Sequence, residues 1–260
     1  MTQQPVATAA GAPAWREDGL LDGRLRLIQP VDGYKVAIDS VLLAAAVDAA
    51  PGAHVLDAGA GTGAALLCLA ARRPDLRVTG LELQALHAGL CHWSIELNAL
   101  AGRARVMAGD LDRPPPELRA TPFDAVMTNP PFTSAGTPPP DGGRARAMME
   151  GMALDRWVAR CLALLRPKGR FFAVHRADRL DDLISALTGK AGEITVLPLW
   201  SRAGRPAERV IIAARKGVRG GARLLPGLVL HQPDATAYTD ETTALLRAGK
   251  ALDLDPLGRL

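Results

Sequence analysis

From residue 53 onward, short apolar segments of strand character alternate with segments of helix character. This alternation constrains the fold more than any other feature, because it requires parallel βαβ units with helices on both faces of one sheet. The expected strands are 54–57, 77–82, 105–107, 123–128, 170–175, 194–200 and 210–215, and the expected helices are 64–72, 85–100, 145–165 and 178–187. Only about nine residues separate the last two strands. That connection is too short for a helical crossover, so this pair is predicted to be antiparallel.

The sequence therefore predicts an α/β fold with a mostly parallel seven-stranded sheet, one antiparallel C-terminal hairpin and helices on both faces. Residues 1–18 are rich in Ala, Pro and Gln and lack the features of a signal peptide, so we expect a flexible N-terminal tail. The turn signals Asp22-Gly23 and Asp32-Gly33 predict that 19–50 form a hairpin and a helix packed on the core. Residues 51–216 form the predicted core, and 217–260 a C-terminal extension with a helix near 241–248.

Composition and charge narrow the class of protein. Hydrophobic residues make up 48% and charged residues 22% of the 260, which is typical of a globular chain. No apolar run approaches the ~20 residues of a membrane span, and the three cysteines are too widely spaced for a disulfide framework or a zinc cluster. We therefore expect a cytoplasmic protein, monomeric or homodimeric, that binds neither a membrane nor a metal.

The chain is basic, with a net charge of +4 and a pI near 9.2. Seven basic residues and one acid, Glu208, lie between Arg202 and Arg223. This segment is either a solvated rim or a surface for the phosphates of a nucleic acid. Arg202 and Arg205 are the candidate phosphate contacts.

A Gly-rich segment links the first core strand to its helix. Asp57 ends the strand, and Gly59, Gly61 and Gly63 follow at alternate positions. Without a Cβ, glycine lets the backbone turn sharply and approach a ligand closely. Leu66 stands where a dinucleotide fingerprint would have its third glycine. An acid before the turn suits the ammonium group of a sulfonium amino acid better than a pyrophosphate, so the segment favours S-adenosylmethionine (SAM) over NAD.

Two further acids end neighbouring strands. Glu82 follows the second strand, where a carboxylate can accept hydrogen bonds from two ribose hydroxyls. Asp110 follows the third strand and is placed to accept from an adenine amino group, the alternative being a loop acid that starts an Asx turn. Leu83 and Leu111, the residues after these acids, also belong to the predicted cofactor-binding set, as does Asn129 after the fourth strand.

The segment Asn129-Pro130-Pro131-Phe132 follows the fourth strand. Ligands of open α/β sheets bind beyond the carboxyl ends of the strands, so this segment faces the same crevice as the Gly-rich turn. The side-chain oxygen of Asn129 and the carbonyl of Pro130 can each accept one hydrogen of an NH₂ group and aim its lone pair at a methyl donor. The two prolines stiffen the loop, and Phe132 offers a face on which a base can stack. These four residues are the predicted catalytic segment.

Together these motifs resemble the class I SAM-dependent methyltransferases that modify amino groups. Within that class, the opening segment with Gln29-Pro30, Asp32-Gly33-Tyr34-Lys35 and Ile38-Asp39-Ser40 resembles the bacterial adenine-N6 methyltransferases that act on valine tRNA. The resemblance implies a Rossmann-like fold, SAM as cofactor and tRNA as substrate. It also implies that Tyr34, Lys35 and Asp39 line the SAM pocket.

The segment after the motif, 133–146, is rich in proline and glycine and contains Arg144 and Arg146, which we predict to contact nucleic acid. Three other functions stay open. One is a methyltransferase for the glutamine side-chain amide (N5) of a protein, which the same motif can hold. The second is a non-catalytic SAM- or RNA-binding partner subunit, and the third is an NAD oxidoreductase, in which Asn129 to Phe132 would have no role.

Overall fold

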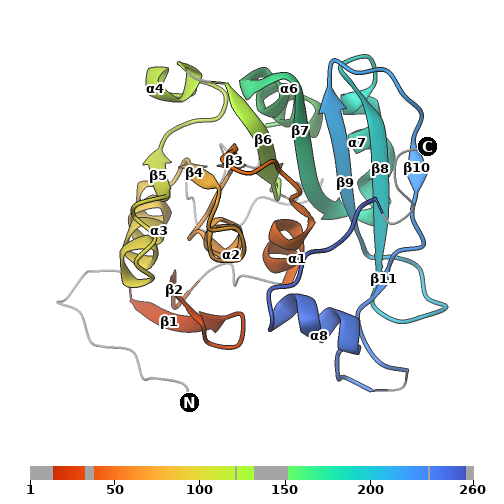
Figure 1. The fold of residues 1–260 in the computed structure, drawn as a ribbon, viewed down its shortest axis with the longest axis horizontal. Coiled ribbons are helices and arrows are strands. Elements are labelled where there is room, and N and C mark those ends of the chain that lie inside the picture. Colours follow the sequence, from red (N-terminus) through yellow and green to blue (C-terminus); the bar gives the residue numbers. More distant parts are fainter. Residues whose placement is uncertain (1–13, 33–37, 121, 132–151, 234, 256–260) are drawn as a thin grey trace.

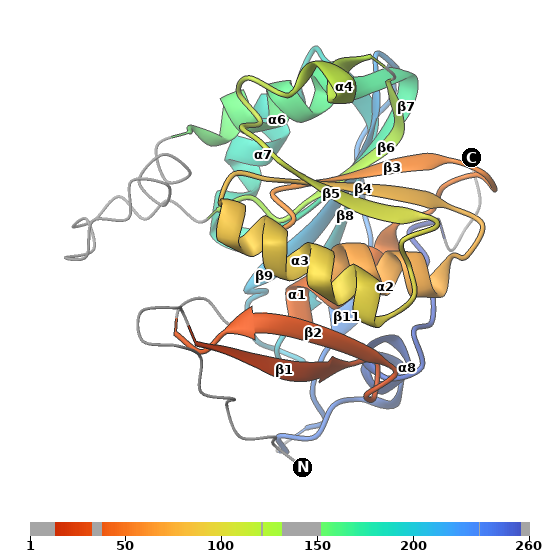
Figure 2. The same cartoon turned by 90° about the vertical axis from the view of Figure 1, so that its left-hand side faces the viewer.

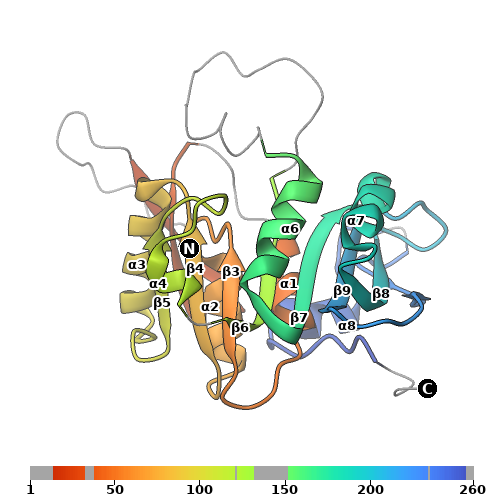
Figure 3. The same cartoon turned by 90° about the horizontal axis from the view of Figure 1, so that it is seen from above.

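The computed structural model describes residues 14–32, 38–120, 122–131, 152–233 and 235–255. Its central sheet contains the seven strands expected from the sequence: β3 (His54–Ala58), β4 (Arg77–Glu82), β5 (Ala104–Ala108), β6 (Phe123–Thr128), β7 (Leu165–Arg176), β8 (Ala191–Trp200) and β9 (Arg209–Lys216). They lie in the order β8-β9-β7-β6-β3-β4-β5, which Figure 3 shows from one edge of the sheet to the other. Only β9 is antiparallel to its neighbours β7 and β8, which confirms the predicted hairpin.

The sheet is wider than predicted. Two short strands, β10 (Arg223–Leu224) and β11 (Leu228–Val229), pair in parallel with β8, which makes nine strands within the described residues. They come from the predicted C-terminal extension, and the backbone N–H of Leu252 in that extension donates to the carbonyl of Ala45 at 2.9 Å. The described residues beyond 216 therefore extend the sheet and pack on the core, because the outer edge of β8 offers unpaired backbone groups.

Helices cover both faces of the sheet, as Figure 2 shows. They are α1 (Ile38–Ala46), α2 (Ala64–Arg72) and α3 (Ala85–Leu97) on one side, and α4 (Pro116–Arg119), α6 (Leu154–Leu164) and α7 (Leu180–Leu187) on the other. The helix α8 (Asp240–Leu246) packs outside α1 (Figure 1). Each face has its own buried apolar cluster. The central strands are apolar without alternation because both of their faces are covered.

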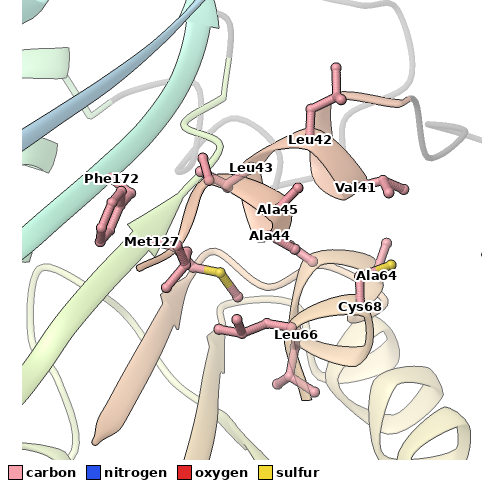
Figure 4. Close-up of a cluster of buried hydrophobic side chains, with 14 of the residues drawn as sticks. Val41, Leu42, Leu43, Ala44, Ala45, Ala64, Leu66, Cys68, Met127 and Phe172 are labelled. Atoms are coloured by element: carbon pink, nitrogen blue, oxygen red, sulfur yellow. The ribbon is translucent and has the colours of Figure 1, made fainter. Parts of the chain in front are cut away.

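Helix α1 is held between α2 and the sheet. Figure 4 shows Leu43 of α1 directed toward Met127 of β6 and Phe172 of β7, while Ala44 faces α2. Leu43, Met127 and Phe172 are all fully buried. This packing fixes α1, and with it the N-terminal segment, against the middle of the sheet.

An antiparallel hairpin of β1 (Trp15–Leu20) and β2 (Leu25–Pro30) packs against α3. The backbone N–H of Ile28 donates to the Ser94 hydroxyl at 2.9 Å. The strand β1 begins inside the segment 1–18 that was predicted as a flexible tail, because Trp15 pairs with Pro30 across the hairpin. The first strand therefore starts earlier than the composition indicates.

Two element boundaries also differ from the prediction. The helix expected at 145–165 begins at Leu154 within the described residues, because Ala153 has an extended backbone. The strand expected at 170–175 starts at Leu165, which pairs with Phe123. The turn residues Pro167 and Gly169, which appeared to end the preceding helix, therefore lie inside β7. A register shift after Phe123 and a positive φ of 63° at Lys168 accommodate them in the strand.

Candidate active site

Four predicted polar residues meet at one edge of the sheet. The strands β3, β4, β5 and β6 are mutually parallel, so their carboxyl ends lie together. Asp57 lies near the end of β3, Glu82 ends β4, Asp110 follows β5 and Asn129 follows β6. The pairing of Ala58 with Thr128 brings Asn129 beside the start of the Gly-rich turn.

The Gly-rich turn requires its glycines. Gly59, Gly61 and Gly63 have φ values of 77°, 57° and 94°, in the left-handed region that favours glycine. A Cβ at Gly59 would lie 3.0 Å from the Trp157 ring, and one at Gly63 would collide with the Cys91 sulfur. At Gly61 a Cβ would meet open space, so the turn presents bare backbone there, as a bound ligand needs.

Glu82 is locked to this turn. Its Oε2 accepts a hydrogen bond from the backbone N–H of Gly61 at 2.8 Å, and its Oε1 accepts from the backbone N–H of Gln84 at 2.8 Å. The residue is 1% exposed. Each carboxylate oxygen can accept a second hydrogen bond, so Glu82 can orient the turn and still bind two hydroxyl groups.

Asp57 is buried beside Glu82, and its Oδ2 has no hydrogen-bond partner among the described residues. Burial raises the pKa of this carboxyl from 3.8 to about 7, and the Glu82 charge adds to the rise, whereas a backbone hydrogen bond from Leu66 opposes it. A buried carboxylate oxygen without a partner is costly unless a cation or donor compensates it. The position therefore suits a positively charged ligand group.

Asp110 lines a pocket together with Gly59, Leu83, Leu111, Met152 and Trp157. Its Oδ1 also accepts from the backbone N–H of Asp112 at 2.8 Å, which is the Asx turn considered as the alternative. The turn therefore orients Asp110 at the pocket. Arg160 of α6 ties this loop down through an ion pair with Asp112 at 2.9 Å.

Asn129 is held by the residue before it and the two after it. The Thr128 hydroxyl donates to the Ala58 carbonyl at 2.7 Å and accepts from the Trp157 indole N–H at 2.9 Å. Pro130 and Pro131 line a second small pocket. The Asn129 side-chain oxygen is buried and has no hydrogen-bond partner in the part of the chain that the structure describes. An unsatisfied buried acceptor at a stiff strand end is suited to receive an N–H from a ligand.

Comparison with known proteins agrees with this geometry. The family model described as the methyltransferase small domain matches residues 34–195. The chain belongs to the methyltransferase small domain family. The adenine-N6 methyltransferases named for position 37 of tRNA1(Val) are similar to it: that of Aeromonas salmonicida is 30% identical over 210 residues, which cover 79% of this chain and 86% of the relative.

The corresponding enzyme of Porphyromonas gingivalis is 34% identical over 156 residues, which cover 57% of this chain. That match spans only 61% of the relative's length. A solved structure described as a predicted O-methyltransferase from Agrobacterium tumefaciens matches 84% of this chain and all of its own, with a TM-score of 0.70 and 24% identity. The fold is therefore that of the Rossmann-like methyltransferases, as predicted, and the cofactor class is SAM.

Several predicted site residues of this methyltransferase-family chain lie outside the described residues: Tyr34, Lys35, Phe132, Arg144 and Arg146. Asp39 is described and buried, and it forms an ion pair with Arg209 of β9 at 3.1 Å. Its contact with a cofactor stays a prediction. Arg202 and Arg205 lie in the connection between β8 and β9, at the same edge of the sheet as Asn129, and neither makes an ion pair with another described residue.

The sequence analysis did not assign Trp157 and Met152 to the site. Both residues line the pocket beside Asp110 as well as the pocket beside Pro130. Trp157 is buried, like a core residue, and its ring also limits the space above Gly59. A tryptophan on the apolar face of a helix is typical of the core, so the sequence offers no signal that Trp157 also lines the pocket.

In the described part of the chain, no group of three or more His, Cys, Asp or Glu side chains is arranged to hold a metal ion. Across the same residues, no helix has the length and apolar character needed to cross a membrane.

Proposed function

We propose that this protein transfers a methyl group from SAM to the N6 amino group of an adenine in tRNA. The observation that carries the proposal is the buried, unsatisfied side-chain oxygen of Asn129 at the carboxyl end of β6. The relatives named as tRNA1(Val) adenine-N6 methyltransferases support adenine in tRNA as the acceptor.

The residues at the carboxyl edge fit SAM. Asp57 offers an unpaired buried carboxyl oxygen to the ammonium group, and Glu82 retains acceptor capacity for the two ribose hydroxyls. Leu83, Asp110 and Leu111 line the pocket for the adenine ring, and Gly61 leaves the backbone open. When bound, SAM supplies an electrophilic methyl group on a positively charged sulfur.

Asn129 and Pro130 orient the acceptor. The Asn129 oxygen accepts one N–H of the target amine and the Pro130 carbonyl accepts the other, which aims the nitrogen lone pair at the methyl carbon. The new N–C bond forms as the carbon–sulfur bond breaks, and the nitrogen then loses a proton. No strong base is needed, because the nitrogen becomes acidic as it is methylated. Orientation of this kind is what a displacement between two bound groups requires.

Charge at the same edge suits a polyanion. Arg202 and Arg205 are not neutralised by described acids, and phosphate contacts position RNA without reading its sequence. We include both residues, with Arg144 and Arg146, in the proposed RNA-binding surface. This charge favours tRNA over the glutamine side chain of a protein as the acceptor.

The proposal is tested with purified protein, labelled SAM and unmodified tRNA transcripts, followed by mass spectrometry of the released nucleosides. N6-methyladenosine is expected with the wild type and is expected to be lost with Asn129→Ala. Methylated glutamine in a protein acceptor, with no modified nucleoside in any tRNA, would refute the assignment of the acceptor.

A further inference from the structure

The pocket beside Pro130 and Pro131 adjoins both the acceptor segment and the proposed cofactor site. Its other described lining residues are Met152, Leu154, Trp157, His175 and Arg179. Met152 and Trp157 also line the pocket beside Asp110, so the two pockets share a wall. We call the one beside Pro130 the acceptor pocket, because it lies next to the two atoms proposed to hold the target amine.

The sheet brings Arg179 to this pocket. The strands β6 and β7 are parallel, and Thr128 pairs with Ala173. Two residues farther along each strand, Pro130 therefore lies beside His175 at the carboxyl edge. The short 3-10 helix η1 (Ala177–Arg179) follows β7 directly, and the helices α6 and α7 on either side of the pocket cover the same face of the sheet (Figure 2). Arg179 thus reaches the acceptor segment from a separate part of the chain.

Arg179 supplies the charge of the acceptor pocket. His175 is buried, and burial lowers its pKa to about 4, while a hydrogen bond with the Arg176 backbone opposes this fall and the nearby charge of Arg179 adds to it. The imidazole is therefore neutral at physiological pH. The remaining described residues of the lining are proline, methionine, leucine and tryptophan. An uncharged interior with one guanidinium suits a neutral ring that carries an anionic group.

The present partner of Arg179 can be exchanged. Its Nε–H donates to the carboxylate of Asp182 one turn later, and the two side chains are 37% and 45% exposed. An ion pair exposed to this degree contributes little to stability, so a ligand anion can compete with it. The bond to Asp182 uses Nε, and the two terminal nitrogens of a guanidinium can bind a phosphate through parallel hydrogen bonds.

We propose that Arg179 binds a phosphate directly next to the target adenine and so positions that nucleotide at Asn129. This inference rests on the proposed function. A base that reaches Asn129 arrives with its ribose and its flanking phosphates attached, and phosphate contacts fix the position of RNA without reading its sequence. The side chain of a glutamine in a protein brings no such group. Arg179 is a positioning residue, since no step of methyl transfer passes through it.

The test uses a short RNA that contains the target adenine, after this adenine has been mapped by mass spectrometry. The phosphate on its 5′ or its 3′ side is replaced by a methylphosphonate, which carries no charge. One of the two replacements is expected to weaken binding to the wild-type protein on the order of tenfold. Arg179→Gln is expected to weaken binding of the natural RNA by a similar factor and to remove the effect of that replacement, because both changes delete the same contact.

Two further measurements separate positioning from damage to the fold. The single-turnover rate at saturating RNA should stay near that of the wild type in Arg179→Gln, because a contact made equally before and during the reaction affects binding alone. SAM affinity and melting temperature should also be unchanged. Asp182→Asn frees Arg179 from its partner and is expected to tighten RNA binding by up to about fivefold.

Arg176→Gln is the matched control. Arg176 ends β7 and forms an ion pair with Asp178, but it does not line the acceptor pocket. This variant should lose affinity on methylphosphonate replacement as the wild type does. The same loss in Arg179→Gln, or natural RNA bound by Arg179→Gln with wild-type affinity, would overturn the inference. So would a loss of SAM affinity, which would assign the guanidinium to the carboxylate of the cofactor. Failure of the proposed function appears separately, as absence of methylated nucleosides with the wild-type protein.

Discussion

Substitution of Asp57 by Asn should remove a pH-dependent loss of folding stability that arises in the candidate cofactor site. Asp57 is buried, and burial raises its pKa from 3.8 to about 7. Between these two pH values the native state holds a proton that the unfolded state has released. The stability contributed by this group therefore falls as the pH rises through the window and is constant above about pH 7.

The size of the effect follows from the pKa difference. A rise from 3.8 to about 7 is roughly three pK units, and each unit corresponds to ~1.36 kcal/mol, which amounts to roughly 4 kcal/mol at neutral pH. Asparagine has nearly the same shape and does not titrate. The free energy of unfolding of Asp57→Asn relative to the wild type should therefore increase by this order between pH 4 and 7 and then stay level.

Urea unfolding of the cofactor-free protein at a series of pH values measures this difference. Asp112→Asn is the control, because Arg156 and Arg160 hold the pKa of Asp112 below its usual range, so that its carboxylate is ionised in both the native and the unfolded state over this window. Its difference from the wild type should be flat above pH 4. A flat difference for Asp57→Asn as well would refute the reasoning that burial destabilises the ionised form of Asp57 in the native state.

Binding of SAM should show the complementary dependence. If the ionised Asp57 carboxylate holds the ammonium group, wild-type affinity for SAM rises about tenfold per pH unit below about 7 and then levels off. The Asp57→Asn variant should bind SAM more weakly at pH 8 and show little dependence on pH. Calorimetric titration at pH 5.5, 6.5 and 8 measures the SAM affinity of the wild type and of Asp57→Asn. If affinity changes with pH in the same way for both proteins, Asp57 does not bind the ammonium group.

Three further variants test the acceptor site, the RNA surface and the core. Asn129→Ala should lower the single-turnover rate of methyl transfer to tRNA on the order of 10²–10³-fold, as the loss of one preorganised polar contact does in other enzymes. SAM affinity, measured in parallel, should be nearly unchanged. A near wild-type rate would mean that the motif is only a loop that ends the strand. The double change of Arg202→Glu and Arg205→Glu should lower the slope of log K against log salt for tRNA binding by about one per lost phosphate contact, whereas an unchanged slope would assign both arginines to solvated surface. Leu43→Ala removes a fully buried side chain that faces Met127 and Phe172 and should destabilise the protein by ~2–5 kcal/mol in urea unfolding, and a smaller loss would mean that α1 can move to fill the space.

Local patterns were enough to predict the alternating elements, the antiparallel pair at the end of the core and the residues at the carboxyl ends of β3 to β6. This succeeds because parallel strands must end at one edge of the sheet, so that residues at strand ends meet whatever the details of packing. The glycines of the turn after Asp57 were recognisable for the same reason, since their left-handed backbone is a local requirement.

Contacts between distant segments could not be predicted from local sequence patterns. The double role of Trp157 depends on where α6 lies above Gly59, and the pairing of β10 and β11 depends on the free edge of β8. The pairing of Asp39 with Arg209 joins α1 to β9 across 170 positions of the chain. The sequence by itself determined which residues end each strand, because strand and turn preferences act over a few neighbours. Only the tertiary structure decided which of their polar atoms are left without a partner, because burial and hydrogen bonding depend on every element that packs around them.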